Sequence, residues 1–298
     1  MIEELLIKHL QEEGQELSSY LATFGGKLAI FNQEAPKDTD AGWGEKTQYG
    51  RIVFDIDTTQ DTERKVSGVL LVDISCEKSQ TPPEYIEPIV KELIDGYFFT
   101  TQELTMAAQW KASNYFTEPT KKVNGVTLSF DLLAFPSQLT TDPDPVKTTN
   151  DWLKTLYPAA KVIGLDALPD VWKPTIDNPA FYCRLLNLGA GRMPSTAAVT
   201  WIGATMRIGV LAPTENVRAR ETKNCIQVLT NETRIIMNDG SPMLIDDMSV
   251  DLTADQLRVG QILIKATYGV LNTYTGKPLK NVYVSGIGAE SEVTNRGN

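Results

Sequence analysis

The stretch VNGVTLSFDLLAFP, from Val123 to Pro136, has a counterpart in VGQILIKATYGVLN, from Val259 to Asn272. Each places a glycine just before an apolar run of similar length. In the first run, Val126, Leu128 and Phe130 alternate with more polar residues, and this period of two is typical of a strand with one buried face. We therefore expect two closing strands, one near the middle of the chain and one near its end.

The segments ahead of the two closing strands follow one order: helix, short strand, hairpin, helix and irregular strand. In the first half they are a helix from Ile2 to Leu10, KLAIF (27–31), YGRIVFDID (49–57) with KVSGVLLVDIS (65–75), a helix in 81–96 and FFTTQELTMAAQW (98–110). In the second half they are a helix from Asn150, DVWKP (170–174), AFYCRLLNL (180–188) with AVTWIGATMRIGVLA (198–212), a helix in 213–232 and a broken strand over 233–252. A repeat of this length favours duplication over a solenoid of short repeats.

This order predicts an α+β fold with two tandem copies of a small domain, each a mostly antiparallel or mixed sheet flanked by helices. The alternative is two unrelated α+β domains that share only common elements. The stretch PSQLTTDPDPVKTTND holds three prolines and two Asp-Pro steps, which is typical of a linker. We place the first domain at 1–140, the linker at 141–149 and the second domain at 150–298, with a loose C-terminal tail.

Capping residues set the expected helix starts. Asn150 and Thr214 are placed to cap the two helices of the second half, and Thr81 to cap the second helix of the first half. Pro88 removes a backbone donor, so that helix is expected to kink or to start late.

The net charge of −10 is unevenly distributed. Residues 1–150 contain 24 acidic and 13 basic residues, whereas residues 151–298 contain 14 and 15. Gripping nucleic acid needs clustered Lys and Arg, so the acidic half is not expected to hold it. An acidic surface remains compatible with nucleic acid that slides past, although acidity also simply favours solubility.

No pattern of catalytic or metal-binding residues stands out. The single histidine, His9, lies on the first helix, and Cys76, Cys183 and Cys225 are too scattered for a zinc site or a disulfide framework, so they are expected to be buried thiols. Asp55 and Asp57 share a strand face that could hold Mg²⁺ but is better explained as solvated. GWGEKT and LGAGRM depart from the phosphate-binding patterns and are interpreted as turns. We predict no catalytic residue, cofactor or metal.

Neither end of the sequence suggests a membrane. No apolar run approaches the roughly 18 residues of a span, and the acidic N-terminus lacks the features of a secretory signal. We therefore expect a soluble protein of a cytoplasm, without a membrane partner.

Trp43 stands between two glycines in the polar loop NQEAPKDTDAGWGEKTQ. A large ring in such a loop needs a covering surface. It either folds back onto its own domain or anchors a partner on assembly.

The order of the first unit, from the helix at Ile2 through KLAIF and the polar-tipped hairpin to VNGVTLSFDLLAF, resembles the tail terminator and tail completion proteins of long-tailed bacteriophages. The resemblance covers residues 1–136 best and residues 150–272 more weakly, and it includes no signature motif. It implies a non-enzymatic virion protein of the neck or tail top, assembled in the host cytoplasm. Such a protein forms a ring that caps the tail tube, docks the head–tail connector and lets DNA pass without sequence-specific binding. The duplication departs from the family's usual single domain, so the ring could be a trimer of double units or a hexamer.

The candidate assembly contacts lie in three loops: Gly42, Trp43, Lys46 and Tyr49, then Asp61 and Arg64, and finally Arg192 and Met193. Two alternatives remain at this point. One is another neck, connector or sheath-terminating protein of a contractile tail. The other is a two-domain cytoplasmic enzyme or small-molecule binder with a site between its domains.

Overall fold

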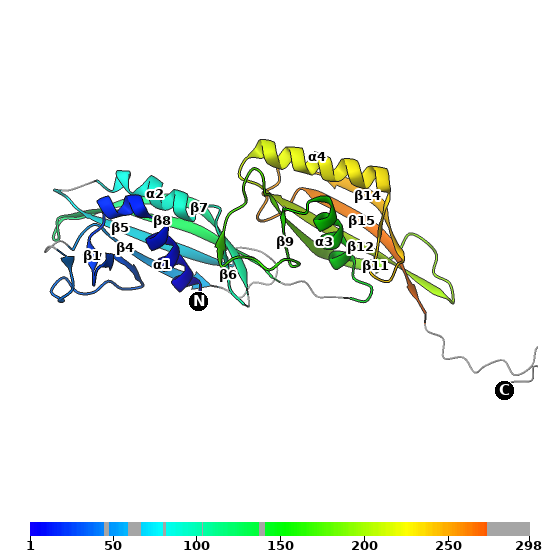
Figure 1. Cartoon of the computed structure of the whole chain (residues 1–298), viewed down its shortest axis with the longest axis horizontal. Coiled ribbons are helices and arrows are strands. Elements are labelled where there is room, and N and C mark those ends of the chain that lie inside the picture. The colour runs from blue at the N-terminus through cyan, green and yellow to red at the C-terminus, as the bar shows by residue number, and fades with distance from the viewer. Residues whose placement is uncertain (45–47, 59–66, 80–81, 103, 137–140, 273–298) are drawn as a thin grey trace, which may run out of the picture.

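The computed structural model describes residues 1–44, 48–58, 67–79, 82–102, 104–136 and 141–272. These residues form two sheet-rich units arranged end to end (Figure 1). The first unit contains α1 (Ile2–Glu12), β1 (Thr23–Phe24), β2 (Lys27–Leu28), β3 (Ile30–Asn32), β4 (Arg51–Thr58), β5 (Gly68–Glu77), α2 (Glu87–Ile94), β6 (Phe98–Thr100), β7 (Thr105–Glu118) and β8 (Val123–Phe135). The second contains α3 (Pro145–Leu156), β9 (Lys161–Ile163), β10 (Val171–Trp172), β11 (Ala180–Ala190), β12 (Val199–Leu211), α4 (Glu215–Glu232), β13 (Arg234–Ile236), β14 (Pro242–Val250) and β15 (Ile262–Leu271).

The two units share one topology. The first sheet runs β6-β7-β8-β5-β4-β3 and the second runs β13-β14-β15-β12-β11-β9. In each, the outer short strand (β3 or β9) pairs in parallel with the first hairpin strand, and the other neighbours pair antiparallel. The predicted α+β fold with two similar copies and a mixed sheet is confirmed, and β8 and β15 are the paired closing strands.

Each sheet also has a bulge in the strand next to its closing strand, two residues apart in the register that the units share. The register of β7 against β8 shifts around Lys111, and that of β14 against β15 shifts around Asp246. Each extra residue contacts the closing strand. Lys111 Nζ lies 3.3 Å from Asp131 Oδ1, and Thr267 Oγ1 donates to Asp246 Oδ2 over 2.5 Å. The side chains and their exact positions differ, but in both units the extra residue contacts the closing strand.

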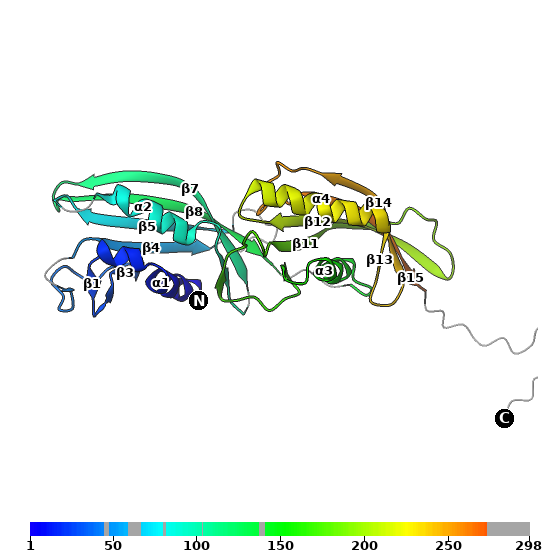
Figure 2. The ribbon, with the colours of Figure 1, turned by 45° about the horizontal axis from the view of Figure 1, so that its top comes forward.

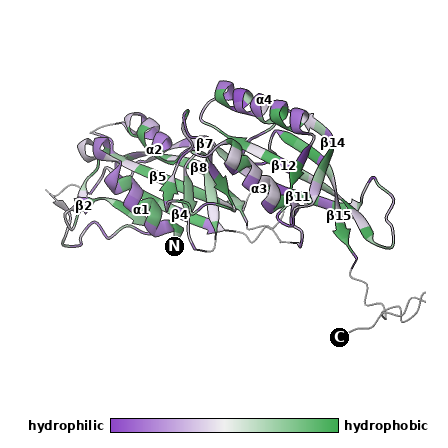
Figure 3. Cartoon of the chain, turned by 45° about the vertical axis from the view of Figure 1, so that its right-hand side comes forward, coloured by the Kyte–Doolittle hydropathy of each residue, from purple (hydrophilic) through white to green (hydrophobic). Residues whose placement is uncertain are grey.

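The helices cover one face of each sheet, and outside the contact between the units the other face is not covered by a described helix. In Figure 2 the helices of both units lie in front of their sheets, and Figure 3 shows α4 banded in hydrophilic and hydrophobic colours while the strands are largely hydrophobic. Residues such as Leu6, Val90 and Phe130 form the first core, and Leu153, Met206 and Leu229 belong to the second. The alternation of apolar residues along each strand follows from this one-sided burial.

One predicted helix begins earlier than expected. The side chain of Asp144 accepts from the backbone N–H groups of Val146 and Lys147, and Pro145 occupies the first turn of α3. The expectation that Asn150 caps this helix is therefore wrong, and residues 145–149, expected in a linker, form its buried first turns. An Asp-Pro step is typical of a helix start as well as of a linker, because proline suits a position whose N–H has no helical partner.

The structure agrees with two other expectations about helix starts. Thr214 accepts from Val217 N and begins α4 as predicted. The late start expected from Pro88 is also observed, because a short 3-10 turn (Pro83–Tyr85) precedes α2. Thr81 lies outside the described residues.

The end of β8 is buried on both faces. Leu132 and Ala134 face the first core, while Leu133 and Phe135 face the second unit, where they pack with Tyr182 and other apolar residues of a shared cluster. This double burial explains why VNGVTLSFDLLAFP ends in a continuous apolar run.

A strand from the second unit completes the first sheet. β10 pairs antiparallel with β6, and the ring of Trp172 stacks on Phe98 with centroids 4.3 Å apart. DVWKP is thus a strand as expected, but it belongs to the sheet of the other unit.

A buried carboxylate adds a charged link between the units. Asp131 on β8 is 3% exposed, and Arg258 Nη2 of the second unit donates to its Oδ2 over 2.5 Å. Gln109 lies beside this pair: its Oε1 accepts from Arg258 Nε at 3.2 Å, and its Nε2 donates to Asp255. These contacts fix the angle between the two sheets.

Removing the cap of α3 should weaken the fold. We expect Asp144→Ala to lower the free energy of unfolding by about 1–2 kcal/mol, because two backbone N–H groups lose their acceptor. Urea denaturation followed by circular dichroism measures this change. Asp142→Ala, at an exposed aspartate that also precedes a proline, is the control and should shift stability by less than about 0.5 kcal/mol. Equal effects of the two variants would contradict the assigned cap.

The ion pairs of Asp131 lead to a second prediction. Arg258→Ala should lower the free energy of unfolding by about 2 kcal/mol, because Lys111 is then the one ion-pair partner of the buried carboxylate among the described residues. Adding Asp131→Asn should recover part of the loss, since the uncompensated charge is then removed. Lys265→Ala, which breaks an exposed pair with Asp247, is the control and should cost under about 1 kcal/mol. Strictly additive losses from the two junction changes would contradict the coupling.

Candidate assembly surfaces

Aromatic residues cluster at the outer end of the first unit. Trp43 packs against Phe24 and Phe31, with ring centroids 5.1 and 5.8 Å away, and its Nε1 donates to Lys37 O over 3.0 Å. Its backbone forms an isolated antiparallel bridge with Phe24. Of the two interpretations of Trp43, folding back onto its own unit describes this structure. The ring remains only half-buried, so part of it still faces outward.

The glycines on either side of Trp43 have a steric reason. A Cβ on Gly42 would come within 2.9 Å of the Phe24 ring, and φ there is +142°, where side chains are strained. A Cβ on Gly44 would meet Thr23 Oγ1 at 2.2 Å. The loop can therefore lie this close to the β1–β2 hairpin only with glycine at both positions.

Tyr49 extends the cluster to a charged edge. Its hydroxyl donates to Asp38 Oδ2 over 3.2 Å, Arg51 pairs with Asp38 at 3.0 Å, and the Arg51 guanidinium lies 4.7 Å from the Tyr49 ring centroid. Burial, followed by the nearby charge of Asp38, raises the pKa of Tyr49. The structure therefore brings Gly42, Trp43 and Tyr49 together.

The remaining predicted contacts are elsewhere. Lys46, Asp61 and Arg64 lie outside the described residues. Arg192 and Met193 are exposed at the β11–β12 turn, and Arg192 N donates to Thr267 Oγ1 over 3.2 Å. Figure 1 shows this hairpin at the far end of the second unit, so the first-unit and second-unit candidates are separated by the length of the molecule.

The bare sheet faces differ in charge. On the first sheet, Asp55 and Asp57 are both exposed, which confirms that they form a solvated face. On the second sheet, Arg184 and Arg207 are direct cross-strand partners, and neither Nε has a hydrogen-bond partner among the residues that the structure describes. Their neighbours Cys183 and Met206 face the second core, so the two guanidiniums lie on the bare face. Burial, together with the charge of Arg207, lowers the pKa of Arg184.

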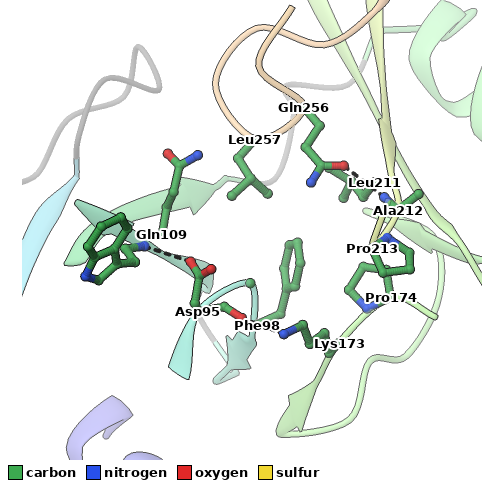
Figure 4. Close-up of a pocket in the computed structure, with 12 residues that line it drawn as sticks. Asp95, Phe98, Gln109, Lys173, Pro174, Leu211, Ala212, Pro213, Gln256 and Leu257 are labelled. Atoms are coloured by element: carbon green, nitrogen blue, oxygen red, sulfur yellow. Dashed lines mark hydrogen bonds between the residues drawn. The ribbon is translucent and has the colours of Figure 1, made fainter. Parts of the chain in front are cut away.

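A pocket of about 300 Å³ lies between the units (Figure 4). Several of its polar groups already form hydrogen bonds within the protein. Asp95 Oδ1 accepts from Trp110 N, Lys173 Nζ donates to Asp95 O, and Gln256 Oε1 accepts from Ala212 N, all at 2.7–2.9 Å. The polar side chains that line the pocket are therefore held in place by hydrogen bonds of the fold.

Elsewhere the described part of the chain offers little for catalysis. It holds no group of three His, Cys, Asp or Glu side chains placed to bind a metal. His9 is buried, and its Nε2 bonds Leu93 O at 2.9 Å, linking α1 to α2. Cys76, Cys183 and Cys225 are free and buried, as predicted. None of the helices described is long and apolar enough to cross a membrane.

Comparison of the sequence with protein-family models found no match, and a search of curated proteins likewise found no significant one.

Sequence reasoning missed the contact between the units. Trp172 stands eight residues before β11, as Trp43 stands eight residues before β4. The equal spacing depends on the observed strand starts, because the sequence pattern placed the start of the first hairpin strand at Tyr49, six residues after Trp43. Arg258 and Asp131 lie 127 residues apart, and no sequence pattern indicates that they pair.

The buried thiols predict a pH dependence. Burial raises the pKa of Cys76 to about 11 and the pKa values of Cys183 and Cys225 to about 12. The native protein should therefore react with a thiol reagent at pH 8 at least tenfold more slowly than the urea-unfolded chain. The contribution of the three buried thiols to the free energy of unfolding should be fully present below about pH 8.5, the ordinary pKa of a thiol in the unfolded chain. It should be lost as the pH rises toward 11–12. Rapid titration of a thiol in the native state would contradict this burial.

Proposed function

We propose that this chain is a structural protein of a long-tailed bacteriophage, which caps the tail tube and joins tail to head as part of a ring through which DNA passes. The observation that carries the proposal is the contact between the units. One unit lends a strand to the edge of a second unit of the same topology. Edge-to-edge addition of equal units is a means of building larger assemblies.

Capping requires a surface that matches the tube below and differs above. A growing tube end offers strand edges and apolar patches to the next ring. The half-buried aromatic cluster around Trp43 and the exposed β11–β12 turn with Met193 are suited to cover such patches. Two similar units that carry different side chains could present one surface to the tube and another to the head connector.

The charges fit a passage for DNA on one side of the molecule. Exposed Asp55, Asp57 and Asp73 lie on the bare face of the first sheet. A carboxylate-lined surface repels phosphates and lets DNA slide, because binding would require cations that displace counterions. Six sites on a tube could be met by three chains with two units each, or by six chains whose second units form an outer collar.

Two alternatives stand beside this proposal. A neck or sheath-terminating protein of a contractile tail would use the same kinds of contacts and is distinguished by the neighbour it binds. An enzyme or small-molecule binder would use the pocket between the units, whose polar groups are engaged in the fold.

The test combines purified protein with the tail tube protein of the same virion. We expect negative-stain electron microscopy to show rings with a central hole, and tubes assembled in the presence of the protein to stop growing and to carry one ring at an end. The control is the same tube assembly with an equal amount of an unrelated acidic protein. Tubes of unchanged length without end rings would overturn the capping function.

A further inference from the structure

We infer that the chain binds a second copy of itself head to tail, with the Gly42–Trp43 segment of one copy pairing along the open edge of β13 in the next. The inference rests on the proposed function, which it deepens by naming the contact between subunits. It follows from the contact that already joins the two units of one chain.

The contact within the chain supplies the template. The connection between β9 and β11 reaches the first unit, and Val171 and Trp172 pair with Phe99 and Phe98 of β6. The N–H of Thr100 donates to Asp170 O over 2.7 Å. Short backbone pairing and one stacked tryptophan thus complete the edge of a sheet.

β13 is the equivalent edge of the second unit. It ends its sheet in the described part of the chain, as β6 would without β10. In β6, Phe99 faces the core opposite Met106, and in β13, Ile235 faces the core opposite Met243. This match places the 58% exposed Ile236 where Thr100 stands in β6.

The equivalent donor is the connection between β3 and β4. It spans residues 33–50, and the connection between β9 and β11 spans 164–179. Each leaves a short parallel edge strand, and each carries a tryptophan eight residues before the next strand. Gly42 and Trp43 therefore correspond to Val171 and Trp172. Both Gly42 and Ala41 are exposed.

The chemistry of the two ends is complementary. By the same match, exposed Arg234 stands where Phe98 stacks on Trp172 in the first unit. A guanidinium can take that place, because it stacks on the face of an indole ring. The exposed carboxylate of Asp40 adds an opposite charge beside Trp43.

The two ends point away from each other. Figure 2 shows β1 and the nearby loops at one end of the elongated molecule and β13 toward the other. One copy cannot satisfy both ends, because they lie toward opposite ends of the elongated molecule. Two antiparallel copies related by a two-fold axis would pair both ends reciprocally, so a wild-type dimer in the experiment below would contradict the head-to-tail arrangement. A head-to-tail contact between unlike surfaces closes into a ring or continues as a filament.

The experiment blocks one end at a time. Ile236→Asp places a charge on the open edge of β13, where assembly would bury it. Trp43→Ala removes the indole ring of the segment that pairs with this edge. We expect wild-type protein to form assemblies larger than dimers in size-exclusion chromatography with light scattering. Each variant alone should be monomeric, because the dissociation constant of the contact between copies should rise at least tenfold. A mixture of the two should form one-to-one dimers and nothing larger, because only one good contact remains.

Controls separate folding from assembly. Leu252→Asp places a charge at another exposed apolar residue of the second unit and should leave the assembly unchanged. Arg234→Glu tests the acceptor again without touching the aromatic cluster, and should weaken assembly as Ile236→Asp does. Wild-type-sized assemblies from both single-end variants would overturn the inference, as would a monomeric wild type. If such protein still capped tubes, the proposed function would stand without this contact.

Discussion

Asp131 is the charge on which the arrangement of the two units depends. A carboxylate that is 3% exposed needs counter-charges, and they come from the bulge of its own sheet and from Arg258 of the other unit. Beside it, the apolar end of β8 is buried on its second face only because the second unit covers it. Separating the units would therefore expose apolar surface and leave a buried charge partly unpaired. This constraint makes the angle between the sheets a fixed property of the chain.

The two units agree more closely in backbone topology than in side chains. Strand order, strand direction and the bulge opposite the closing strand recur, whereas the bulge residue is Lys111 in one unit and Asp246 in the other. The bulge is a matter of backbone geometry, and either side chain can bond the facing residue. Charge diverged further, since the bare faces carry aspartates in the first sheet and a pair of arginines in the second. Equal folds with unequal surfaces suit a molecule whose two ends and faces meet different neighbours.

Much of the fold could be predicted from local patterns, because one-sided burial imposes a period on each strand and helix. Both closing strands, both hairpins and the Thr214 cap follow from such patterns. The start of α3 was missed because Asp-Pro suits both a linker and a helix start, and only the packing of residues 145–149 decides between them. β10 is two residues long, and its partner β6 lies in the other unit, so no local pattern can assign its sheet. Of the candidate surface, the sequence named Gly42, Trp43 and Tyr49 as contacts of one loop, and their role in assembly stays a prediction. The equivalence of Trp43 with Trp172 depends on the topology of both units.

The fixed angle between the sheets has a consequence for any assembly built from this chain. If the contact between copies repeats the contact within the chain, one rotation relates every unit to the next, and that rotation is already set by Asp131, Arg258 and the shared apolar cluster. The number of units in a ring is then determined inside each chain before any two copies meet. A chain with two units closes only with an even number of them, which three chains satisfy for a six-fold site. Unequal edges would then alternate around the ring, the contact at β6 formed during folding and the contact at β13 during assembly.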